Sequence, residues 1–367
     1  MRDTSRTVNT LASPALSRLT AAGTPAADRP VAIWLLACCA MILAMVVIGG
    51  ITRLTESGLS IMEWAPIAGT LPPLSAAEWQ RIFELYQSIP QYRSINAGMT
   101  LAEFKTIFWW EWVHRLWGRL IGFAFLVPFL WFWWRGRIRK GLAPHLLALF
   151  ALGGLQGLVG WFMVASGFVE QISVSQYRLT LHLGLALGIY GYMFWIACTL
   201  LRPLPAAPAA PGHLRRRLVV LTALAAVTML FGGFVAGLDA GFIYNSFPLM
   251  NGRLLPDEFL ATEPAWLDPF ENPATAQLVH RWLAVALVAA VLWCWTAARR
   301  MTLSDPARRA LDVLLLMALL QAALGITTLL LVMPIPLAAA HQAGAVLLLT
   351  ALLWALHTLR RPAPMAA

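Results

Sequence analysis

Eight runs of about 20 apolar residues divide this chain, and each is long enough to cross the hydrocarbon core of a bilayer as a helix. Charged residues make up 12% of the 367 residues, about half the fraction typical of soluble domains. The sequence therefore predicts an all-α polytopic membrane protein with eight transmembrane helices. The expected spans are 31–51, 106–134, 144–165, 176–201, 218–237, 275–298, 310–333 and 337–358.

Basic residues are concentrated in alternate connections between the apolar runs. The N-terminal tail, the connections 135–140, 202–217 and 298–309, and the C-terminus together hold 18 of the 27 Lys and Arg residues. The other connections hold most of the acids. Because Lys and Arg favour the cytoplasmic side of a membrane, both termini are expected in the cytoplasm, and the net charge of +10 requires no nucleic-acid partner.

The N-terminal segment and the cysteines add two further expectations. Residues 1–29 are polar and are expected to form a disordered cytoplasmic tail before a first helix that is retained. All four cysteines lie inside apolar runs, which predicts neither an exported disulfide nor a metal cluster (Cys38, Cys39, Cys198 and Cys294).

The connection 52–105 is the largest outer segment. Ser75 with Glu78 is typical of a capping box and predicts a short amphipathic helix on the outer surface. Thr100 with Glu103 predicts a second capping box at the start of the next span.

The last four apolar runs repeat landmarks of the first four in the same order. Because each copy has an even number of spans, the copies are expected to lie parallel, related by a pseudo-twofold axis along the membrane normal. We therefore expect two tandem four-helix bundles, an N-terminal half over 30–205 and a C-terminal half over 206–367. The paired landmarks are Gly49-Gly50 with Gly232-Gly233, Val113-His114-Arg115 with Val279-His280-Arg281, Gln156 with Gln321, and His182 with His341.

The seven histidines fall into two groups. Four lie in spans that run inward, each within about two turns of the outer end, and so at similar depth. Of these, His114 and His182 belong to the N-terminal half, and His280 and His341 to the C-terminal half. Each pair can face across a bundle, where cofactor sites are commonly built. The others lie in or beside cytoplasmic connections and are expected to be solvated (His145, His213 and His357).

Two opposed imidazoles suit haem iron, which takes two axial nitrogens from opposite sides. Zinc needs four ligands, or three and a water, and no Cys or carboxylate is available on both sides. Arg115 and Arg281 could pair with haem propionates. The simpler alternative is that the histidines only hydrogen-bond between helices, but four at matching depth favour two bis-His haem sites. Small residues beside the histidines would admit the macrocycle (Gly118, Gly184, Ala284 and Gly344).

The repeat breaks three residues before the first histidine of each pair, where Glu111 precedes His114 but Gln277 precedes His280. An ionisable residue inside a span is a functional candidate by default. In one interpretation Glu111 pairs with Arg115 one turn later. In the other, the first site performs chemistry, with Glu111 as base, nucleophile or electrostatic stabiliser, while the second transfers electrons.

Four segments match the pattern of a known family: GGITRLTESGLSIMEWAPIAGTLPP (49–73), EFKTIFWWEWVHR (103–115), LTLHLG (179–184) and AAAHQAGA (338–345). They resemble haem A synthase, in the branch found in proteobacteria and mitochondria. The resemblance extends over residues 31–358 and includes the duplicated eight-span layout and all four histidines in register. The outer-loop cysteine pair of some bacterial relatives is missing, so a thiol-dependent step does not carry over.

The resemblance implies an oxidoreductase that converts the C8 methyl of haem O to a formyl group, giving haem A for cytochrome oxidase. Two hydroxylations with water-derived oxygen would give a gem-diol that loses water. By position, His114 and His182 would hold the substrate haem, and His280 and His341 a haem b cofactor that passes electrons on. Glu111 would be the catalytic carboxylate.

Partners and location follow from the same resemblance. We expect haem O as substrate, haem O synthase and cytochrome oxidase assembly factors as neighbours, and the bacterial inner membrane as location. The 17 Trp residues offer aromatic surface for a homo-oligomer. Two alternatives remain: a non-enzymatic di-haem b electron carrier, which needs no acid at Glu111, and a haem transporter or chaperone, which needs no second permanent haem.

Overall fold

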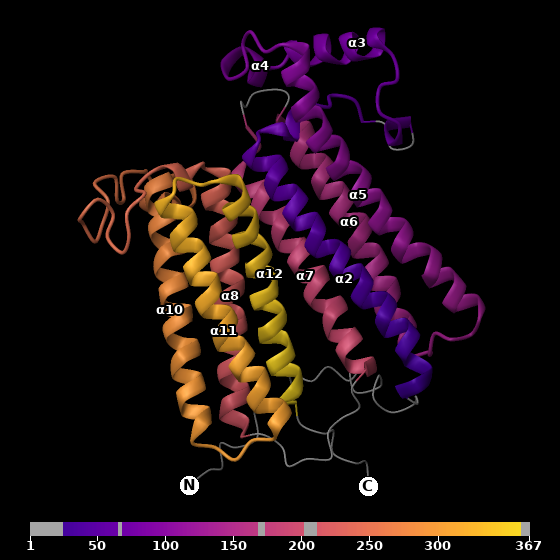
Figure 1. Cartoon of the computed structure of the whole chain (residues 1–367), viewed down its shortest axis with the longest axis vertical. Coiled ribbons are helices and arrows are strands. Elements are labelled where there is room, and N and C mark those ends of the chain that lie inside the picture. Colours follow the sequence, from indigo (N-terminus) through magenta and orange to yellow (C-terminus); the bar gives the residue numbers. More distant parts are fainter. Residues whose placement is uncertain (1–24, 65–67, 168–172, 202–210, 361–367) are drawn as a thin grey trace.

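The computed structural model describes residues 25–64, 68–167, 173–201 and 211–360, and the regular elements of this part of the chain are all helices (Figure 1). Eight of them are long and apolar enough to cross a membrane, which confirms the predicted fold class. They are α2 (Pro25–Leu54), α5 (Leu101–Trp134), α6 (Ala143–Gly167), α7 (Gln176–Leu201), α8 (Gly212–Gly237), α10 (Pro273–Arg299), α11 (Asp305–Leu330) and α12 (Ile335–Thr358).

Most of these helices extend beyond the apolar runs that predicted them. Helix α2 already begins at Pro25, so the last residues of the segment expected to be a tail are helical, while residues 1–24 lie outside the described part. The expected boundary between the halves, 205/206, also lies outside it. Polar residues can prolong a helix past the hydrocarbon core because water satisfies exposed backbone groups at its ends.

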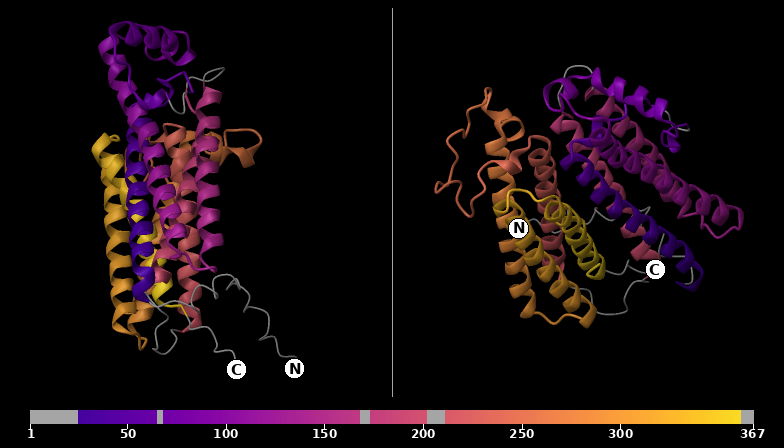
Figure 2. Two further views of the ribbon diagram at one scale, coloured as in Figure 1. Left: turned by 90° about the vertical axis from the view of Figure 1, so that its right-hand side faces the viewer. Right: turned by 45° about the horizontal axis from the view of Figure 1, so that its top comes forward.

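The helices form two groups that follow the chain (Figures 1 and 2). In the first group α2 packs on α5 and α7, and α6 packs on α7 and α5; in the second α8 packs on α10 and α12, and α11 packs on both of these. Between the groups, α2 contacts α12 and α7 contacts α8. Helix α8 is the counterpart of α2, and α12 is the counterpart of α7, so exchanging the halves turns the first contact into the second. This is compatible with two tandem bundles related by an axis along the membrane normal.

Apolar packing fills one end of each group. We call the end at which α2 begins and α12 ends the inner end, and the opposite end the outer end (Figure 1). Leu35, Phe129 and Ile196 belong to the core of the first group, and Leu218 and Leu352 to the core of the second, all towards the inner end. The histidine positions lie outside both cores, nearer the outer end.

Helix α5 is the longest element, and its first turns project beyond the other helices (Figure 1). The Thr100–Glu103 capping box opens it as predicted. The amphipathic helix α3 (Ala76–Gln87) lies across this projection, and its apolar face, including Tyr86, packs on Phe104 of α5. The face is therefore covered by protein.

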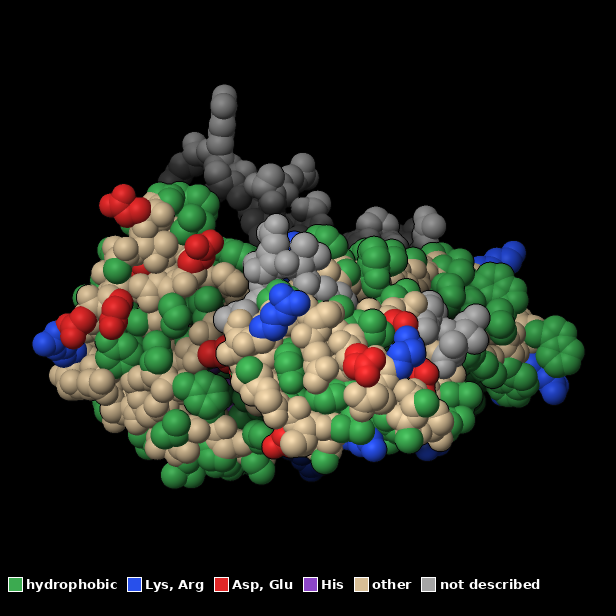
Figure 3. Space-filling view, turned by 90° about the horizontal axis from the view of Figure 1, so that it is seen from above, with side chains coloured by type: hydrophobic (Ala, Val, Ile, Leu, Met, Phe, Trp, Pro, Cys, Tyr) green, Lys and Arg blue, Asp and Glu red, His purple; other side chains and the backbone are tan. Residues whose placement is uncertain are grey.

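The cap of α3 forms only in part. The Ser75 side chain accepts a hydrogen bond from the Glu78 backbone N–H, but the Glu78 carboxylate binds Arg81. Seen from the outer end, acidic side chains are spread among apolar ones over the surface (Figure 3).

Two of the histidines expected to be solvated are buried. His145 bonds the Tyr192 hydroxyl, and His357 lies 3.3 Å from the Thr199 hydroxyl, because both face neighbouring helices. His213 is exposed as predicted. All four cysteines are buried, and none of them forms a disulfide in the structure.

Candidate functional site

Each of the four candidate histidines packs against a glycine of another helix in its own group. A methyl built on any of these glycines would lie 2.7–3.2 Å from the Cε1 atom of the ring, closer than ordinary carbon contacts of 3.5–4.0 Å. An alanine at any of these positions would therefore require the ring or the helix to shift. The pairs are His114 on Gly49 of α2, His182 on Gly160 of α6, His280 on Gly232 of α8, and His341 on Gly325 of α11.

The histidines of each half lie near one another. His114 is close enough to His182 for an electrostatic interaction between the rings, and the same is true of His341 and His280. No group of three or more potential metal-ligating side chains occurs among the described residues. Two nitrogen ligands per site suit a haem iron better than zinc.

Three of the rings contact a polar group that lies one turn before the glycine that each ring packs on. The Gln156 amide lies 3.2 Å from Nδ1 of His182, and the Gln321 amide lies 3.1 Å from Nδ1 of His341. His280 Nδ1 donates to the Thr228 carbonyl at 2.9 Å, the tautomer that leaves the lone pair of Nε2 for a metal. The sequence repeat included both glutamines, but it did not predict that they contact the histidines.

His114 differs from the other three rings. Its Nδ1 atom is buried and has no hydrogen-bond partner among the described residues. An orphaned nitrogen of this kind is expected where an absent group would complete the site.

The small residues expected to admit a macrocycle have other neighbours as well. A methyl on Gly344 would lie 2.2 Å from Oε1 of Gln321, so this glycine makes room for the glutamine beside His341. Gly184 packs on Leu230 in the same way.

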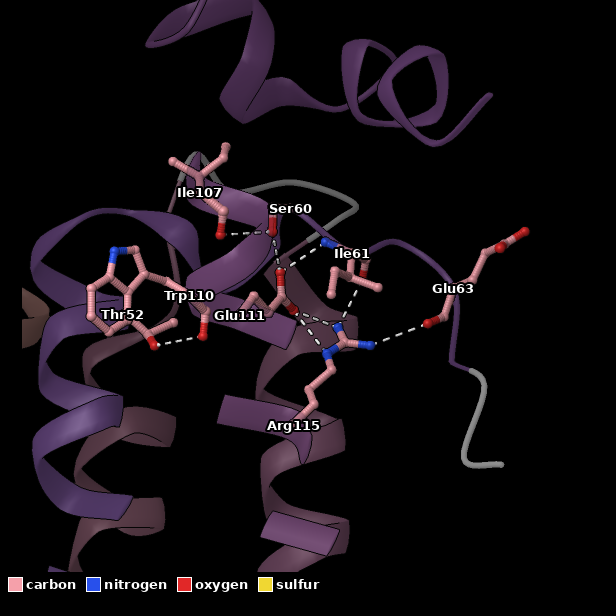
Figure 4. A network of polar contacts seen from close by, with 8 residues as sticks. All are labelled: Thr52, Ser60, Ile61, Glu63, Ile107, Trp110, Glu111 and Arg115. Carbon is pink, nitrogen blue, oxygen red and sulfur yellow. Dashed lines mark hydrogen bonds and ion pairs between the residues drawn. The ribbon is translucent and has the colours of Figure 1, made fainter. Parts of the chain in front are cut away.

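Glu111 is buried, with 3% of its surface exposed, and both carboxylate oxygens are engaged (Figure 4). Oε2 accepts hydrogen bonds from the Ser60 hydroxyl at 2.7 Å and the Ile61 backbone N–H at 2.8 Å. Oε1 accepts from Nε of Arg115 at 3.0 Å, one turn along α5. The ion pair that the sequence offered as one interpretation is thus present.

Arg115 also fastens the outer loop to α5. Its guanidinium donates to the carbonyls of Ile61 at 2.7 Å and Glu63 at 3.1 Å (Figure 4). Most of its hydrogens are used inside the protein, which leaves little capacity for a propionate. Sequence reasoning missed Ser60 and Ile61, because nothing in the sequence pairs these loop positions with Glu111.

The second half has a neutral counterpart of this network. Gln277 is also 3% exposed, and its amide donates to the carbonyls of Ala240 at 2.8 Å and Ile243 at 2.7 Å. Its oxygen accepts a bond from Arg281 at 3.0 Å. The Glu111/Gln277 difference therefore extends to the loops that contact the two side chains.

The second glycine of each Gly-Gly pair joins the halves. A methyl on Gly50 of α2 would overlap Oε1 of Gln342 in α12, at 1.5 Å, and one on Gly233 of α8 would lie 2.8 Å from the Thr180 hydroxyl in α7. Each Gly-Gly pair thus contacts a histidine of its own half and a residue of the other half.

Comparison with known proteins identifies the family. The family model for COX15-CtaA, described as cytochrome oxidase assembly protein, matches residues 32–353. The chain is 53% identical over 339 residues to a protein of Rhodospirillum centenum named Heme A synthase, covering 92% of this chain and 90% of that one. A protein of the same name from Nitrosospira multiformis is 52% identical, over 92% of this chain and 95% of its own. The repeated histidine sites, the acid at position 111 and the match over nearly all the spans agree, and the chain belongs to the haem A synthase family of cytochrome oxidase assembly proteins.

Proposed function

We propose that this protein is an enzyme of haem A biosynthesis, an oxidoreductase that converts the C8 methyl of haem O to a formyl group with water-derived oxygen. The observation that carries the proposal is a change of charge within a duplicated site. Two nearly equivalent pairs of histidines differ by Glu111 in one half and Gln277 in the other. A carrier that only relays electrons needs no such difference.

The ligands follow from the paired rings. In this proposal His114 and His182 hold the substrate haem, and His280 and His341 hold a haem b cofactor. The hydrogen bond from His280 to the Thr228 carbonyl supports the second assignment, because it orients the ring and leaves Nε2 free. The haem b would supply a one-electron carrier beside the substrate site.

The role of Glu111 in this proposal is that of a fixed negative charge. Its two oxygens already accept bonds from Ser60, Ile61 and Arg115. Taking up a proton or attacking the substrate would require one of these bonds to break. Stabilising positive charge that develops during oxidation of the methyl group requires no rearrangement, so the contacts favour it.

Location and partners complete the proposal. In this proposal the histidine sites lie near the outer face of a bacterial inner membrane and both termini lie in the cytoplasm. The concentration of arginines in alternate connections supports this orientation. Haem O would come from haem O synthase, and haem A would pass to cytochrome oxidase assembly factors.

The test is the haem content of detergent-purified protein, measured by chromatography and mass after extraction. Wild-type protein supplied with haem O should contain haem b together with haem O, hydroxylated haem O or haem A. The Glu111→Gln variant should retain haem and make on the order of a hundredfold less haem A.

Glu103→Gln, an exposed acid in the same helix, is the matched control and should keep wild-type product levels. Haem b alone at two per chain, unchanged when haem O is supplied, would show instead an electron carrier.

A further inference from the structure

The outer loops after α2 and α8 share one backbone conformation although their sequences differ. Glu56 and Asp239 both have φ of 52°, in the left-handed region. Each begins a three-residue 3-10 turn, η1 (Ser57–Leu59) in the first half and η3 (Ala240–Phe242) in the second. The loops can therefore be compared position by position.

One arginine fastens each loop through equivalent carbonyls. Arg115 and Arg281 occupy the position after the first histidine of their halves, and each donates to the fifth and seventh carbonyls after the left-handed residue. The bonds are Arg115 to Ile61 at 2.7 Å and Glu63 at 3.1 Å, and Arg281 to Tyr244 at 3.1 Å and Ser246 at 2.8 Å.

The side chain one turn before each arginine bonds its loop in the opposite sense. Glu111 accepts hydrogen bonds from the Ser60 hydroxyl and the Ile61 N–H, whereas the Gln277 amide donates to two carbonyls. A carboxylate can only accept hydrogen bonds, so it does not suit the second loop. The guanidinium of the first half consequently has a carboxylate partner, and that of the second has a neutral amide.

Arg281 is thus a buried charge that no acidic side chain of the described residues pairs with. It is 6% exposed, and its partners are backbone carbonyls and the Gln277 oxygen. Burying a charge without an opposite charge is costly. The described acids of this outer region bind elsewhere: Asp239 to Arg53, Asp257 to Arg253, Glu258 to the Tyr244 hydroxyl, Asp268 to the N–H groups of Leu260 and Thr262, and Glu271 to the Tyr177 hydroxyl, while Glu263 is exposed.

We propose that Arg281, which meets the neutral Gln277 where Arg115 meets the carboxylate of Glu111, raises the reduction potential of the haem held by His280 and His341. The inference rests on the proposed function, since it requires a haem in this half. Reduction adds an electron, so a fixed positive charge nearby stabilises the reduced form, and the effect is larger in a medium of low dielectric constant. Hydrogen bonds around the iron ligands and burial of the site both tune the potential of a haem. Gln277 and Arg281 are therefore positioning residues. Through them, the haem of the second half accepts an electron more readily than it would beside an arginine paired with a carboxylate.

The test is a spectroelectrochemical titration of haem b in the full-length, detergent-purified protein. Arg281→Gln should lower the midpoint potential because it removes the charge, and Gln277→Glu should lower it because it adds a counter-charge. Arg281→Lys keeps the charge but loses the planar fork of hydrogen bonds, and it should retain a potential close to wild type. Arg253→Gln removes a charge from the same outer region at a site 65% exposed, and it should cause no shift.

The variants separate electrostatics from structure. Equal shifts in Arg281→Lys and Arg281→Gln would mean that the arginine acts by holding the loop, and an unchanged potential in Arg281→Gln would also overturn the inference. Gln277→Glu places a carboxylate against two carbonyls and can unfold the loop, but the two Arg281 variants decide the question without it. Wild-type protein that holds no haem b would refute the proposed function itself.

Discussion

The position of each imidazole depends on a glycine, because any longer side chain there would enter the space of the ring. In α6, Gly160 faces His182, and an added methyl would lie 2.9 Å from the ring, whereas Gly157 of the same helix has nothing within 4 Å. Gly160→Ala should therefore displace the ring and reduce haem binding in the first half. Gly157→Ala should bind haem normally and stabilise the helix by up to about 1 kcal/mol, the difference in helix propensity. Haem absorbance per chain and thermal unfolding measure the two effects.

These two glycines make a strict comparison, because they differ by less than one turn in the same helix. Equal haem content in both variants would mean that the ring has room to move, and that the glycine contact does not position His182.

At the level of single residues, the sequence predicted the chemistry better than the contacts. The histidine pairs and the Glu111/Gln277 difference were visible because they lie in helices, where the repeat keeps a fixed spacing. Ser60 was not visible as a partner of Glu111, because the two outer loops conserve backbone conformation rather than residue type. Hydrogen bonds to backbone groups leave little trace in side-chain patterns.

At the level of elements, the apolar runs predicted which helices exist but not where they end. Helix α5 begins five residues before its apolar run, at the capping box, and its projecting turns are covered by α3. The capping box was predicted, but the packing of α3 on α5 was not. An amphipathic pattern indicates that a face will be covered, and it does not distinguish lipid from protein.

The start of α10 depends on one buried acid in the second outer loop. Asp268 opens the short helix α9 (Asp268–Glu271), and it accepts hydrogen bonds from the backbone N–H groups of Leu260 and Thr262 and from the Asn272 amide. Asn272 in turn caps α10. Burial alone would raise the pKa of Asp268, but hydrogen bonds to its carboxylate, among them those from the Thr262 N–H and the Asn272 amide, outweigh it and lower the pKa from 3.8 to about 2.

The sign of the pH dependence follows from that shift. Because the folded pKa lies below the unfolded value, the contribution of Asp268 to stability is present above about pH 4 and is lost as pH falls towards about 2. The protection of the Leu260 and Thr262 amides against hydrogen exchange, taken relative to the intrinsic exchange rate at each pH, should therefore fall over this range.

Asp268→Asn should show fast exchange at neutral pH and little further change in acid. Asp257→Asn is the control, since that carboxylate is 67% exposed and lies in the same loop. Protection of both amides that persists to pH 2 in the wild type would contradict this account.

At the level of the whole molecule, the duplication predicts two similar halves, and function requires that they differ. The described contacts keep the repeat at the four glycines that face the histidines, and at Gln156 and Gln321. They depart from it at Glu111 and Gln277, where charge changes. They also depart from it at the contact between the halves, which we call the seam, where Gly50 meets Gln342 but Gly233 meets Thr180. The sequence could predict the repeat, but the seam required knowledge of which helices meet.

Enlarging one residue of the seam and shortening its partner tests whether the two halves depend on each other through this contact. Gly50→Ala places a methyl 1.5 Å from the observed position of Oε1 of Gln342, so either the glutamine or α2 must move. Overpacking of this kind typically costs about 1–3 kcal/mol. Because Gly49 beside it contacts His114, the displacement should also lower haem binding in the first half.

Shortening the opposing side chain should restore the fit. Gln342→Ala alone should be tolerated with a small loss of stability, and the double variant Gly50→Ala/Gln342→Ala should recover most of the thermal stability and haem content that Gly50→Ala loses. A non-additive recovery of this kind is the mark of two residues in direct contact. If the double variant is instead as unstable as the sum of the single ones, the two halves do not meet through Gly50 and Gln342, and the histidine sites are not joined by this route.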